Sequence, residues 1–394
     1  MIDFELTEEQ EQLRDSCRRF AEGEVRPRAA AIDRITDPRE SFPKDLVRKG
    51  FELGFHTLLV PEQYGGMGGG LLDFSIMMEE LAAGDAGFAF SFAATCAISR
   101  MIAANATPEQ CERWLVPFCE DRTGTFSLGF GGTEPSGGTE IFYADGDPKL
   151  GTRTTATREG DHYVINGSKV FITNAGQSRL YGCMARTDRS GANFVSNSIF
   201  FFPSDTPGFS VGKIEDKMGH RASSNGELVF NDMKLSPDDM LGEEGKGVEI
   251  LLHTYHGNSV GMGALGLGVA RAAYEMALAY AKERHIWGQP IIRYQAVATM
   301  LVNAKMAIET ARLLIQRIAW ASDSGKHGDH VNPSMAKIYA SEVARKVTVD
   351  AMQVLGGYGY MKDYPAEKLV RDSMVIPIYD GTNEVLRHFT SLEL

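Results

Sequence analysis

The chain has 394 residues, 43% of them hydrophobic and 23% charged, a composition typical of a soluble globular protein with two or three domains. Its formal net charge of -12 argues against nucleic acid or an anionic membrane surface as a partner. The sequence shows no signal or transit peptide and no apolar run long enough to span a bilayer, so a cytoplasmic protein or a matured organelle protein is expected. The five cysteines are scattered, without a C-x-x-C pair or nearby histidines, and predict neither a metal site nor disulfides.

The first part of the sequence, to about Arg122, has the pattern of an all-helical domain. Thr7-Glu8-Glu9-Gln10 is a capping box, and the helix that follows it is expected to end near Pro27. Two nearly all-apolar segments predict helices that are buried on most faces. The expected elements are helices over 44–53, 71–83 and 87–104, a short extended piece over 57–61, and a further helix that starts at Thr107-Pro108.

From Gly124 to about Gly242 the pattern changes to short strand-like runs. No segment of helix length lies between these runs, so we expect an antiparallel barrel or sandwich and not a parallel α/β sheet. The runs are 152–157, 162–165, 169–173, 198–202 and 227–230, with turn signals at 166–167, 174–176, 206–208 and 225–226.

Helices return from Gly247 and continue to the end of the chain. Long amphipathic segments over 270–282, 296–322 and 333–355 predict a helical bundle. The predicted fold class is therefore α+β, with an N-terminal helical domain (1–122), a middle β domain (123–242) and a C-terminal helical domain (243–394).

Residues 261–266 match the dinucleotide-binding pattern G-x-G-x-x-G. That pattern requires a preceding strand within a βαβ unit, whereas the surroundings here are helical. We expect these glycines to let a helix approach a neighbour or a cofactor closely.

Near the C-terminus an apolar run ends at a single carboxylate, Asp380. Gly381 can adopt a left-handed turn conformation, and Thr382 or Asn383 can cap a helix expected over 384–391. An apolar wall around the carboxylate raises its pKa above the reference value of about 3.9, which suits a general base. The alternative is a simple turn or N-cap aspartate.

Five segments resemble, in the same order, motifs of the FAD-dependent acyl-CoA dehydrogenase family. Tyr379-Asp380-Gly381-Thr382 resembles the family's Tyr-Glu-Gly-Thr, in which the glutamate is the catalytic base. The others are Thr133-Glu134-Pro135-Ser136-Gly137-Gly138-Thr139 (Thr-Glu-Pro-Gly-Ala-Gly-Ser in the family), Phe171-Ile172-Thr173-Asn174 (Trp-Ile-Thr-Asn), Arg284 to Gln295 (Arg-x-x-Phe-Gly…Gln) and Gln353 to Gly357 (Gln-x-x-Gly-Gly). Each alone also fits an ordinary loop, turn or helix end. Together they cover the whole chain and imply a middle β-barrel and a C-terminal four-helix bundle.

The resemblance implies FAD as cofactor. It implies that Phe171 packs on the isoalloxazine ring and that Arg284 pairs with the pyrophosphate of a neighbouring subunit, for which a guanidinium is suited. A cofactor shared in this way implies at least a dimer, and the family is usually a homotetramer, a dimer of dimers. The implied FAD contacts are Phe130, Thr133, Gly138, Thr139, Phe171, Thr173, Arg284, Trp287, Gln295, Gln353, Gly356, Gly357, Thr382 and Glu384.

The implied reaction removes two hydrogens from an acyl-CoA thioester. Asp380 would take the proton beside the carbonyl, a hydride would pass to flavin N5, and an electron-transferring flavoprotein would reoxidise the flavin. The backbone N–H of Asp380 and a flavin ribityl hydroxyl would polarise the thioester oxygen. The implied substrate contacts are Phe88, Phe92, Thr139, His256, Gly381 and Arg387.

The sequence departs from the family pattern at three places. Asp380 is one methylene shorter than glutamate, which favours a branched or cyclic acyl group that lies closer to it. Phe171 replaces a tryptophan, and His256-Gly257 stands where many relatives have Thr or Glu followed by Arg, which leaves room and removes a cation. Phe88 stands where relatives that take dicarboxylic acyl groups carry Arg, which favours a neutral substrate. Altered chemistry (1,4-elimination, a desulfinase or an oxidase) and a catalytically silent acyl-CoA-binding scaffold are the alternatives.

Overall fold

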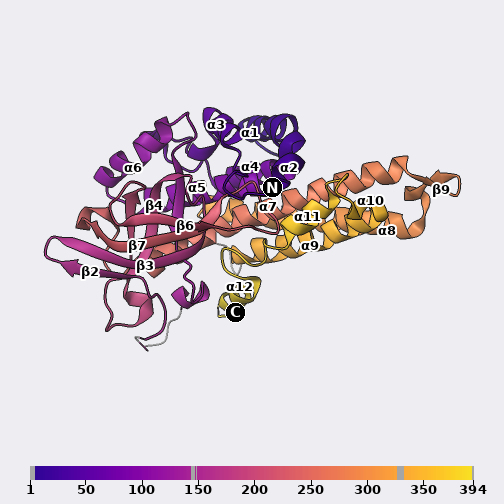
Figure 1. The fold of residues 1–394 in the computed structure, drawn as a ribbon. Helices are drawn as coiled ribbons and strands as arrows, with labels where there is room; N and C mark the ends of the chain where they lie inside the picture. The colour runs from indigo at the N-terminus through magenta and orange to yellow at the C-terminus, as the bar shows by residue number, and fades with distance from the viewer. Residues whose placement is uncertain (1–4, 143–146, 148, 326–331, 393–394) are drawn as a thin grey trace.

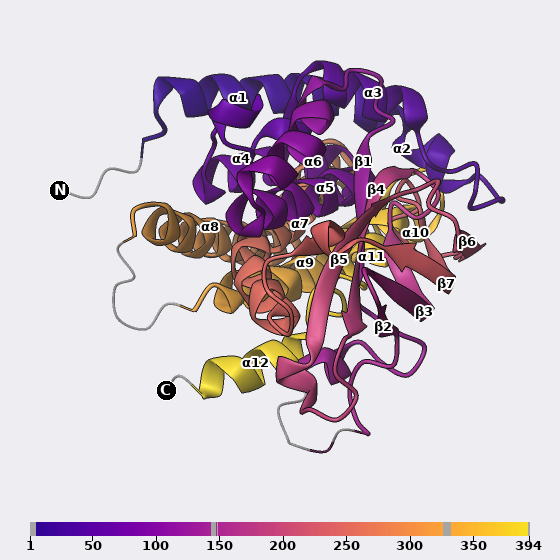
Figure 2. The ribbon, with the colours of Figure 1, turned by 90° about the vertical axis from the view of Figure 1, so that its left-hand side faces the viewer.

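The computed structural model describes residues 5–142, 147, 149–325 and 332–392. A group of N-terminal helices and a twisted sheet lie side by side against a bundle of long C-terminal helices (Figures 1 and 2). Two of these helices extend beyond the rest of the molecule as an arm that ends in a small hairpin (Figure 1). The structure is an α+β fold, with helical, β and helical parts in the order that the sequence predicts.

The N-terminal part is helical. Capping boxes at Thr7 and Thr107 start two of its helices, as predicted. The first helix does not end near Pro27. It continues through a π-turn, and Pro27 lies in the first turn of the next helix, where its missing N–H is not needed. The helices are α1 (Glu8–Phe20), α2 (Arg26–Asp33), α3 (Lys44–Glu52), α4 (Leu71–Gly84), α5 (Ala86–Asn105) and α6 (Pro108–Glu120).

Residues 57–61 do not form the extended piece that was expected. They follow a 3-10 turn (Phe55–Thr57), because amides of the next loop bond to their carbonyls. Met67, Gly68 and Gly69 donate to Thr57, Val60 and Leu58, respectively. The glycine-rich loop thus folds back on this segment.

Helix α5 corrects one expectation about apolar runs. Among the described residues it has the length and hydropathy of a membrane span, but 83% of its apolar window is buried inside the protein. Its side chains form the centre of the helical core, where Phe88 and Phe92 contact Phe20, Phe51 and Phe55. It is the core helix of this part of the chain.

The sheet has the strand order β6-β7-β3-β2-β4-β5-β8, with β1 paired to β4. Most pairs are antiparallel, as predicted, but β1 and β2 both run parallel to β4. The strands are β1 (Ser127–Gly131), β2 (Thr155–Glu159), β3 (His162–Thr173), β4 (Ser178–Arg186), β5 (Asn197–Pro203), β6 (Phe209–Ile214), β7 (Asn225–Leu235) and β8 (Met240–Leu241).

Two predicted turns lie within strands. Asn166-Gly167 is a bulge in a continuous β3, because Gly167 adopts a φ of 144° and the pairing with β7 resumes beyond it. Asn225-Gly226 opens β7. The prediction of a turn at 166–167 is therefore wrong.

The C-terminal part is built around α7 (Gly247–Glu283), much longer than the predicted 270–282. The matched glycines lie in this helix, so the dinucleotide pattern is excluded. A Cβ at Gly261 would lie 2.1 Å from Phe74, and one at Gly268 would lie 2.3 Å from the carbonyl of Glu79, so these glycines allow α4 to pack closely on α7. The other elements are β9 (His285–Ile286), β10 (Gln289–Pro290), α8 (Gln295–Asp323), α9 (Ser334–Leu355), α10 (Gly357–Tyr360), α11 (Ala366–Ser373) and α12 (Asn383–Ser391).

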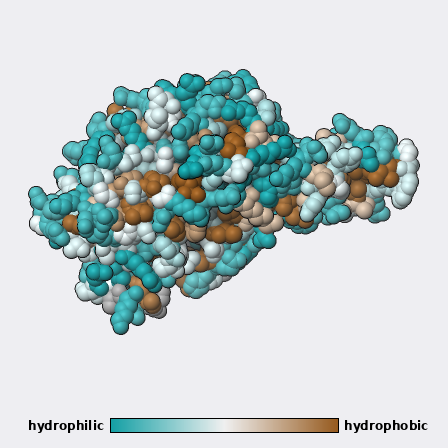
Figure 3. All heavy atoms as spheres, in the orientation of Figure 1, coloured by the Kyte–Doolittle hydropathy of each residue, from teal (hydrophilic) through white to brown (hydrophobic). Residues whose placement is uncertain are grey.

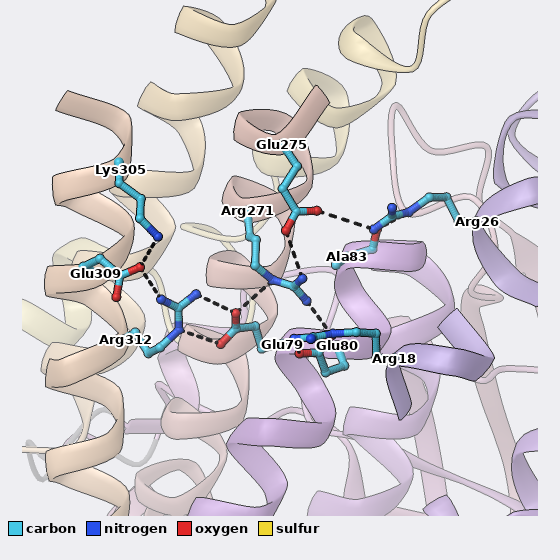
Figure 4. A network of polar contacts seen from close by, with 10 residues as sticks. All are labelled: Arg18, Arg26, Glu79, Glu80, Ala83, Arg271, Glu275, Lys305, Glu309 and Arg312. Atoms are coloured by element: carbon cyan, nitrogen blue, oxygen red, sulfur yellow. Dashed lines mark hydrogen bonds and ion pairs between the residues drawn. The ribbon is translucent and has the colours of Figure 1, made fainter. Parts of the chain in front are cut away.

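A buried ionic network fixes α4 to the C-terminal helices (Figure 4). Arg271 of α7 binds Glu79 and Glu80 of α4 at 2.9 and 2.7 Å, and Arg312 of α8 binds Glu79 at 2.8 Å. Arg18 of α1 binds Glu80 from the other side. Each buried carboxylate therefore has two guanidinium partners, which offsets the cost of its desolvation.

We expect Arg271→Met to lower the free energy of unfolding by about 3–5 kcal/mol, because it leaves two buried carboxylates without their shared partner. The urea midpoint measures this loss. Arg39→Met, which breaks an exposed pair with Asp37, is the control and should move the midpoint little. Equal midpoints for the two variants would show that the network does not hold the domains.

Candidate active site

The turn before α12 has a strained backbone. Asp380 and Gly381 both have positive φ, at 50° and 82°, and Thr382 caps α12 by accepting a hydrogen bond from the amide of Val385. A left-handed aspartate is uncommon, and strain of this kind persists only where the surroundings impose it. The predicted cap and helix are confirmed.

The carboxyl group of Asp380 is surrounded by protein atoms, although the residue retains some accessible surface. The amide nitrogen of Asn258, on α7, donates a hydrogen bond to its Oδ2. Burial raises the pKa of Asp380 to about 6, while the charge of Lys337 and the bond from Asn258 act in the opposite direction. The group therefore titrates close to neutral pH.

Lys337 of α9 binds the turn that carries Asp380 and Gly381. Its side chain is completely buried, and Nζ donates to the carbonyl of Gly381 at 2.8 Å and to Oδ1 of Asn383 at 3.0 Å. Burial lowers the pKa of Lys337 to about 8, and the nearby Asp380 and Glu384 oppose that shift. The backbone carbonyl beside the base is thus fixed by a cation.

The residue of α7 that contacts Asp380 is Asn258, not His256. His256 is exposed on the same helix, two residues earlier. The place beside Gly257 is not vacant either. A Cβ there would lie 2.2 Å from Nη1 of Arg100, so the guanidinium of α5 packs against this glycine.

An aromatic wall stands beside the base. Phe90 of α5 stacks on Tyr379 with ring centroids 4.3 Å apart, and the ring of His220 lies 5.7 Å from both. The Tyr379 hydroxyl and Oδ1 of Asn258 are buried without a hydrogen-bond partner in the described part of the chain. Unsatisfied polar atoms of this kind are typical of a site that binds a ligand.

Phe90 takes the place that was expected for Phe88 and Phe92. Both of those rings are about 1% exposed and pack into the helical core, because they point to the opposite side of α5. Arg387 forms an exposed ion pair with Glu342. The structure does not bring these three side chains to Asp380.

A second group of predicted residues surrounds the end of β3. Phe171 has a φ of 62° and is 63% exposed, because a bulge in the pairing with β7 turns it outward. The next turn is fixed by Asn174, whose Nδ2 donates to the carbonyls of Ser91 and Leu128 and to the hydroxyl of Thr95. The aromatic ring is thus presented to solvent on a rigid base.

The loop from Thr133 to Thr139 closes on itself and is fixed by a buried ion pair. Glu134 accepts hydrogen bonds from Lys169 of β3 and from the amides of Arg153 and Thr154, at 2.7–2.8 Å. A Cβ at Gly138 would lie 3.1 Å from the hydroxyl oxygen of Thr133. Phe130 lies in β1 just before this loop.

The remaining predicted cofactor residues, apart from Thr382 and Glu384, belong to the elements of the arm: the hairpin β9–β10, the start of α8 and the passage from α9 to α10 (Figure 1). Arg284 lies over the ring of Tyr358, and Trp287 is 90% exposed. Arg284 follows Asn258 by 26 residues along α7, roughly 39 Å at 1.5 Å per residue. One protomer therefore presents a group of residues on the arm that is separate from those near Asp380 and the end of β3. The arm group comprises Arg284, Trp287, Gln295, Gln353, Gly356 and Gly357.

Three family models match the chain. They describe the N-terminal domain of acyl-CoA dehydrogenase (residues 7–122), its middle domain (129–233) and its C-terminal domain (245–391). The chain belongs to the acyl-CoA dehydrogenase family.

Individual relatives are similar over nearly their whole length. The short-chain specific acyl-CoA dehydrogenase of Clostridium acetobutylicum is 41% identical, covering 98% of this chain and 97% of its own. The structure of butyryl-CoA dehydrogenase from Megasphaera elsdenii has a TM-score of 0.91 at 38% identity, over 99% of both chains. A chain solved with the electron transferring flavoprotein of Acidaminococcus fermentans also has a TM-score of 0.91 at 38% identity, over 99% of this chain and 98% of its own.

The acyl-CoA dehydrogenase is therefore an FAD-dependent oxidoreductase, and structural neighbours include FAD complexes. The residues present fit a flavin. The hydroxyls of Thr133, Thr139 and Thr173 make no hydrogen bond to the described residues, and Phe171, two residues before Thr173, has an exposed ring. No cluster that could hold a metal occurs among the described residues, and all five cysteines are buried and unpaired.

Sequence reasoning missed Lys337, Asn258 and Arg100. Arg100 lies on a long helix, and little in its local pattern marks it. A lysine at a core position of α9 was a signal for Lys337, since buried lysines have partners. Asn258 could be found only by knowing which residue of α7 packs against the turn that carries Asp380.

We expect Asn174→Ala to weaken FAD retention and to lower the free energy of unfolding by about 2 kcal/mol, because it leaves buried acceptors unpaired. FAD content after gel filtration and the urea midpoint measure the two effects. Asn166→Ala, at the exposed bulge of the same strand, is the control and should retain FAD. Full retention of FAD in Asn174→Ala would contradict this role.

Proposed function

We propose that this acyl-CoA dehydrogenase converts an acyl-CoA to the enoyl-CoA with Asp380 as the base. The raised pKa of Asp380, at about 6 inside a turn fixed by Lys337 and Asn258, is the observation that carries the proposal. A base is most effective when its pKa lies near the working pH. An ordinary turn aspartate needs neither buried partner.

The chemistry removes a proton and a hydride from adjacent carbons and forms a double bond between them. Asp380 would accept the proton from the carbon next to the thioester carbonyl, and the amide N–H of the same residue would bind the carbonyl oxygen as negative charge develops. FAD, when bound, accepts the hydride. The protein contributes position, exclusion of water and the protonation state of the carboxylate.

The residues in the two groups suggest how FAD is held. Phe171 and the hydroxyls of Thr133, Thr139 and Thr173 would bind the cofactor of their own protomer. Arg284, Gln295, Gln353 and the Gly356-Gly357 pair would bind that of a second protomer, since the arm carries them far from Asp380. Thr382 and Glu384 lie at the start of α12, and Phe389 of this helix contacts Phe142, three residues after Thr139.

This division supports a homo-oligomer. Val302, Met306, Leu313 and Trp320 form an apolar stripe along α8, each at least 50% exposed. Apolar atoms are visible along the arm in Figure 3. A stripe of this kind on a long helix favours association with another copy. A homotetramer, a dimer of dimers, fits both the stripe and the divided cofactor site.

The substrate is proposed to be a compact acyl thioester. The aspartate is shorter than a glutamate by one methylene, so the reacting carbon must lie closer to the backbone, as in a branched or cyclic acyl group. The short-chain and butyryl-CoA specificity named for the relatives also favours a small acyl group. An electron-transferring flavoprotein is proposed as acceptor, in line with the similar chain from A. fermentans.

We expect Asp380→Asn to retain FAD but to reduce it with substrate at least 100-fold more slowly, because the amide cannot accept the proton. Anaerobic bleaching of the flavin band after addition of butyryl-CoA or a branched or cyclic analogue measures the rate. Asp161→Asn, the same change at an aspartate whose side chain is fully exposed, is the control. A wild-type rate in Asp380→Asn would overturn the assignment, and a lack of bleaching in the wild type with every thioester would favour a scaffold.

The rate should depend on pH with the ionisation of Asp380. The carboxylate is the active form, so flavin reduction should rise through pH 6 as the proton is lost. Lys337→Met removes the cation that opposes the raised pKa, so the midpoint should move to higher pH. Lys346→Met, an exposed lysine on the same helix, should leave the profile in place. A shift to lower pH in Lys337→Met would contradict the electrostatic role.

A further inference from the structure

The imidazole of His220 lies beside the turn that carries Asp380, and its hydrogen-bonding atoms have no partner. The ring centroid is 5.7 Å from that of Tyr379, the residue before Asp380, and 5.7 Å from that of Phe90 on α5. His220 is only 2% exposed, and neither ring nitrogen bonds to any described part of the chain. A buried polar group in a folded protein normally has a partner, so these two nitrogens need an explanation.

The backbone of His220, and not its ring, fixes the residue in place. Its φ of 52° is unusual for a residue other than glycine. The amide donates to Oδ1 of Asp372 at 2.7 Å, and the carbonyl accepts from Nζ of Lys217 at 2.7 Å. A Cβ at Gly87 would lie 2.7 Å from the carbonyl carbon of His220, so α5 packs directly on this backbone. The position of the ring therefore does not depend on any hydrogen bond of its nitrogens.

The imidazole is neutral at physiological pH. Burial lowers the pKa of His220 to about 4; the charge of Asp372 opposes this shift, and the charges of Lys217 and Lys368 add to it. A neutral imidazole has one N–H donor and one acceptor nitrogen. Both lysines are already bonded to oxygen atoms of the protein. The place therefore suits an uncharged partner that both donates and accepts, and not an anion.

The hydroxyl of Tyr379 adds a second unpaired group beside the base. It is buried without a hydrogen-bond partner among the described residues, and its ring stacks on Phe90 with centroids 4.3 Å apart. The imidazole comes from the loop before β7 and the phenol from the turn that carries Asp380, and the two rings meet there. An alkyl group bound at this place would leave both polar groups unpaired, which is unfavourable.

We propose that His220 and Tyr379 bind a hydroxyl group on the acyl chain, so that the substrate is the thioester of a short hydroxy acid. A hydroxyl group donates and accepts, which matches a donor and an acceptor on the protein. Because the two rings lie next to the base, the hydroxyl belongs beyond the two carbons that form the double bond, and the reaction leaves it unchanged. Such an acyl group is uncharged, in line with the neutral substrate expected from the sequence.

This proposal rests on the dehydrogenase activity proposed above, and matched substrates separate the two. The holoenzyme is given 4-hydroxybutyryl-CoA and pentanoyl-CoA, which differ only by a hydroxyl in place of a methyl group, and the pair 5-hydroxypentanoyl-CoA and hexanoyl-CoA. The kcat/KM of flavin reduction is measured for each. We expect the hydroxyl substrate to exceed its methyl partner by about 100-fold for one chain length, because the methyl group leaves buried polar groups unpaired. Unreactive thioether analogues of the same acyl groups, titrated by calorimetry, should bind in the same order.

Two variants test the residues themselves. His220→Phe keeps an aromatic ring but removes both nitrogens, and Tyr379→Phe removes only the hydroxyl. Both should reduce the hydroxyl-to-methyl ratio at least 10-fold in each measurement. Tyr163→Phe removes a hydroxyl that bonds to Glu244 in the β domain, and it should leave the ratio unchanged. Because each variant serves as its own reference, a general loss of stability or FAD does not change the ratio.

The outcomes separate the site from the activity. A wild type that reduces its flavin with butyryl-CoA and the methyl substrates, but shows no preference for a hydroxyl group, overturns the hydroxyl site and leaves the proposed function intact. A preference that survives in both variants also overturns the site, since the hydroxyl would then bind elsewhere. No reduction by any thioester overturns the proposed function, and the calorimetry of the analogues then decides on the hydroxyl site alone.

Discussion

The hydrogen bond from Lys337 to the carbonyl of Gly381 is the contact on which the site depends. The turn has two successive residues with positive φ, of which only the glycine adopts such a conformation readily. A buried ammonium that binds the carbonyl and the Asn383 side chain stabilises that turn. The same ammonium lies close enough to Asp380 to moderate the pKa that burial raises. Backbone geometry and electrostatics are thus set by one side chain.

The close packing of α7 brings the rest of the molecule to this turn. Gly261 and Gly268 allow α4 to approach the helix, and Gly257 allows α5 to place Arg100 against it. The ion pairs of Arg271 with Glu79 and Glu80 then fix the distance between the N-terminal helices and α7 (Figure 4). The same long helix carries Asn258 to the base and Arg284 to the far tip of the arm. One long helix therefore contributes Asn258 to the turn that carries Asp380 and sets the distance from that turn to Arg284.

Much of this fold could be predicted from the sequence, because its main signals are local. The capping boxes at Thr7 and Thr107, the apolar helix α5 and the cap at Thr382 depend on neighbouring residues. The bulge at Gly167 could not be predicted, since the same Asn-Gly pair suits a hairpin turn and only the pairing with β7 decides between them. The aspartate was found for a similar reason: a carboxylate between an apolar run and a Gly-Thr cap is a local pattern. Its partners lie 43 and 122 residues away in the sequence, and only the fold shows that they meet Asp380.

Arg100 lies at a place that comparison of sequence motifs could not assign to it. The resemblance implied that a cation is missing at Gly257, and the inference of an uncharged, roomier site followed from that position alone. In the folded protein the absent side chain is what makes space, and a guanidinium from another helix occupies it. A glycine in the middle of a helix costs about 1 kcal/mol relative to alanine. The cation that the glycine admits has no anion among the described residues, so packing does not offset its own desolvation.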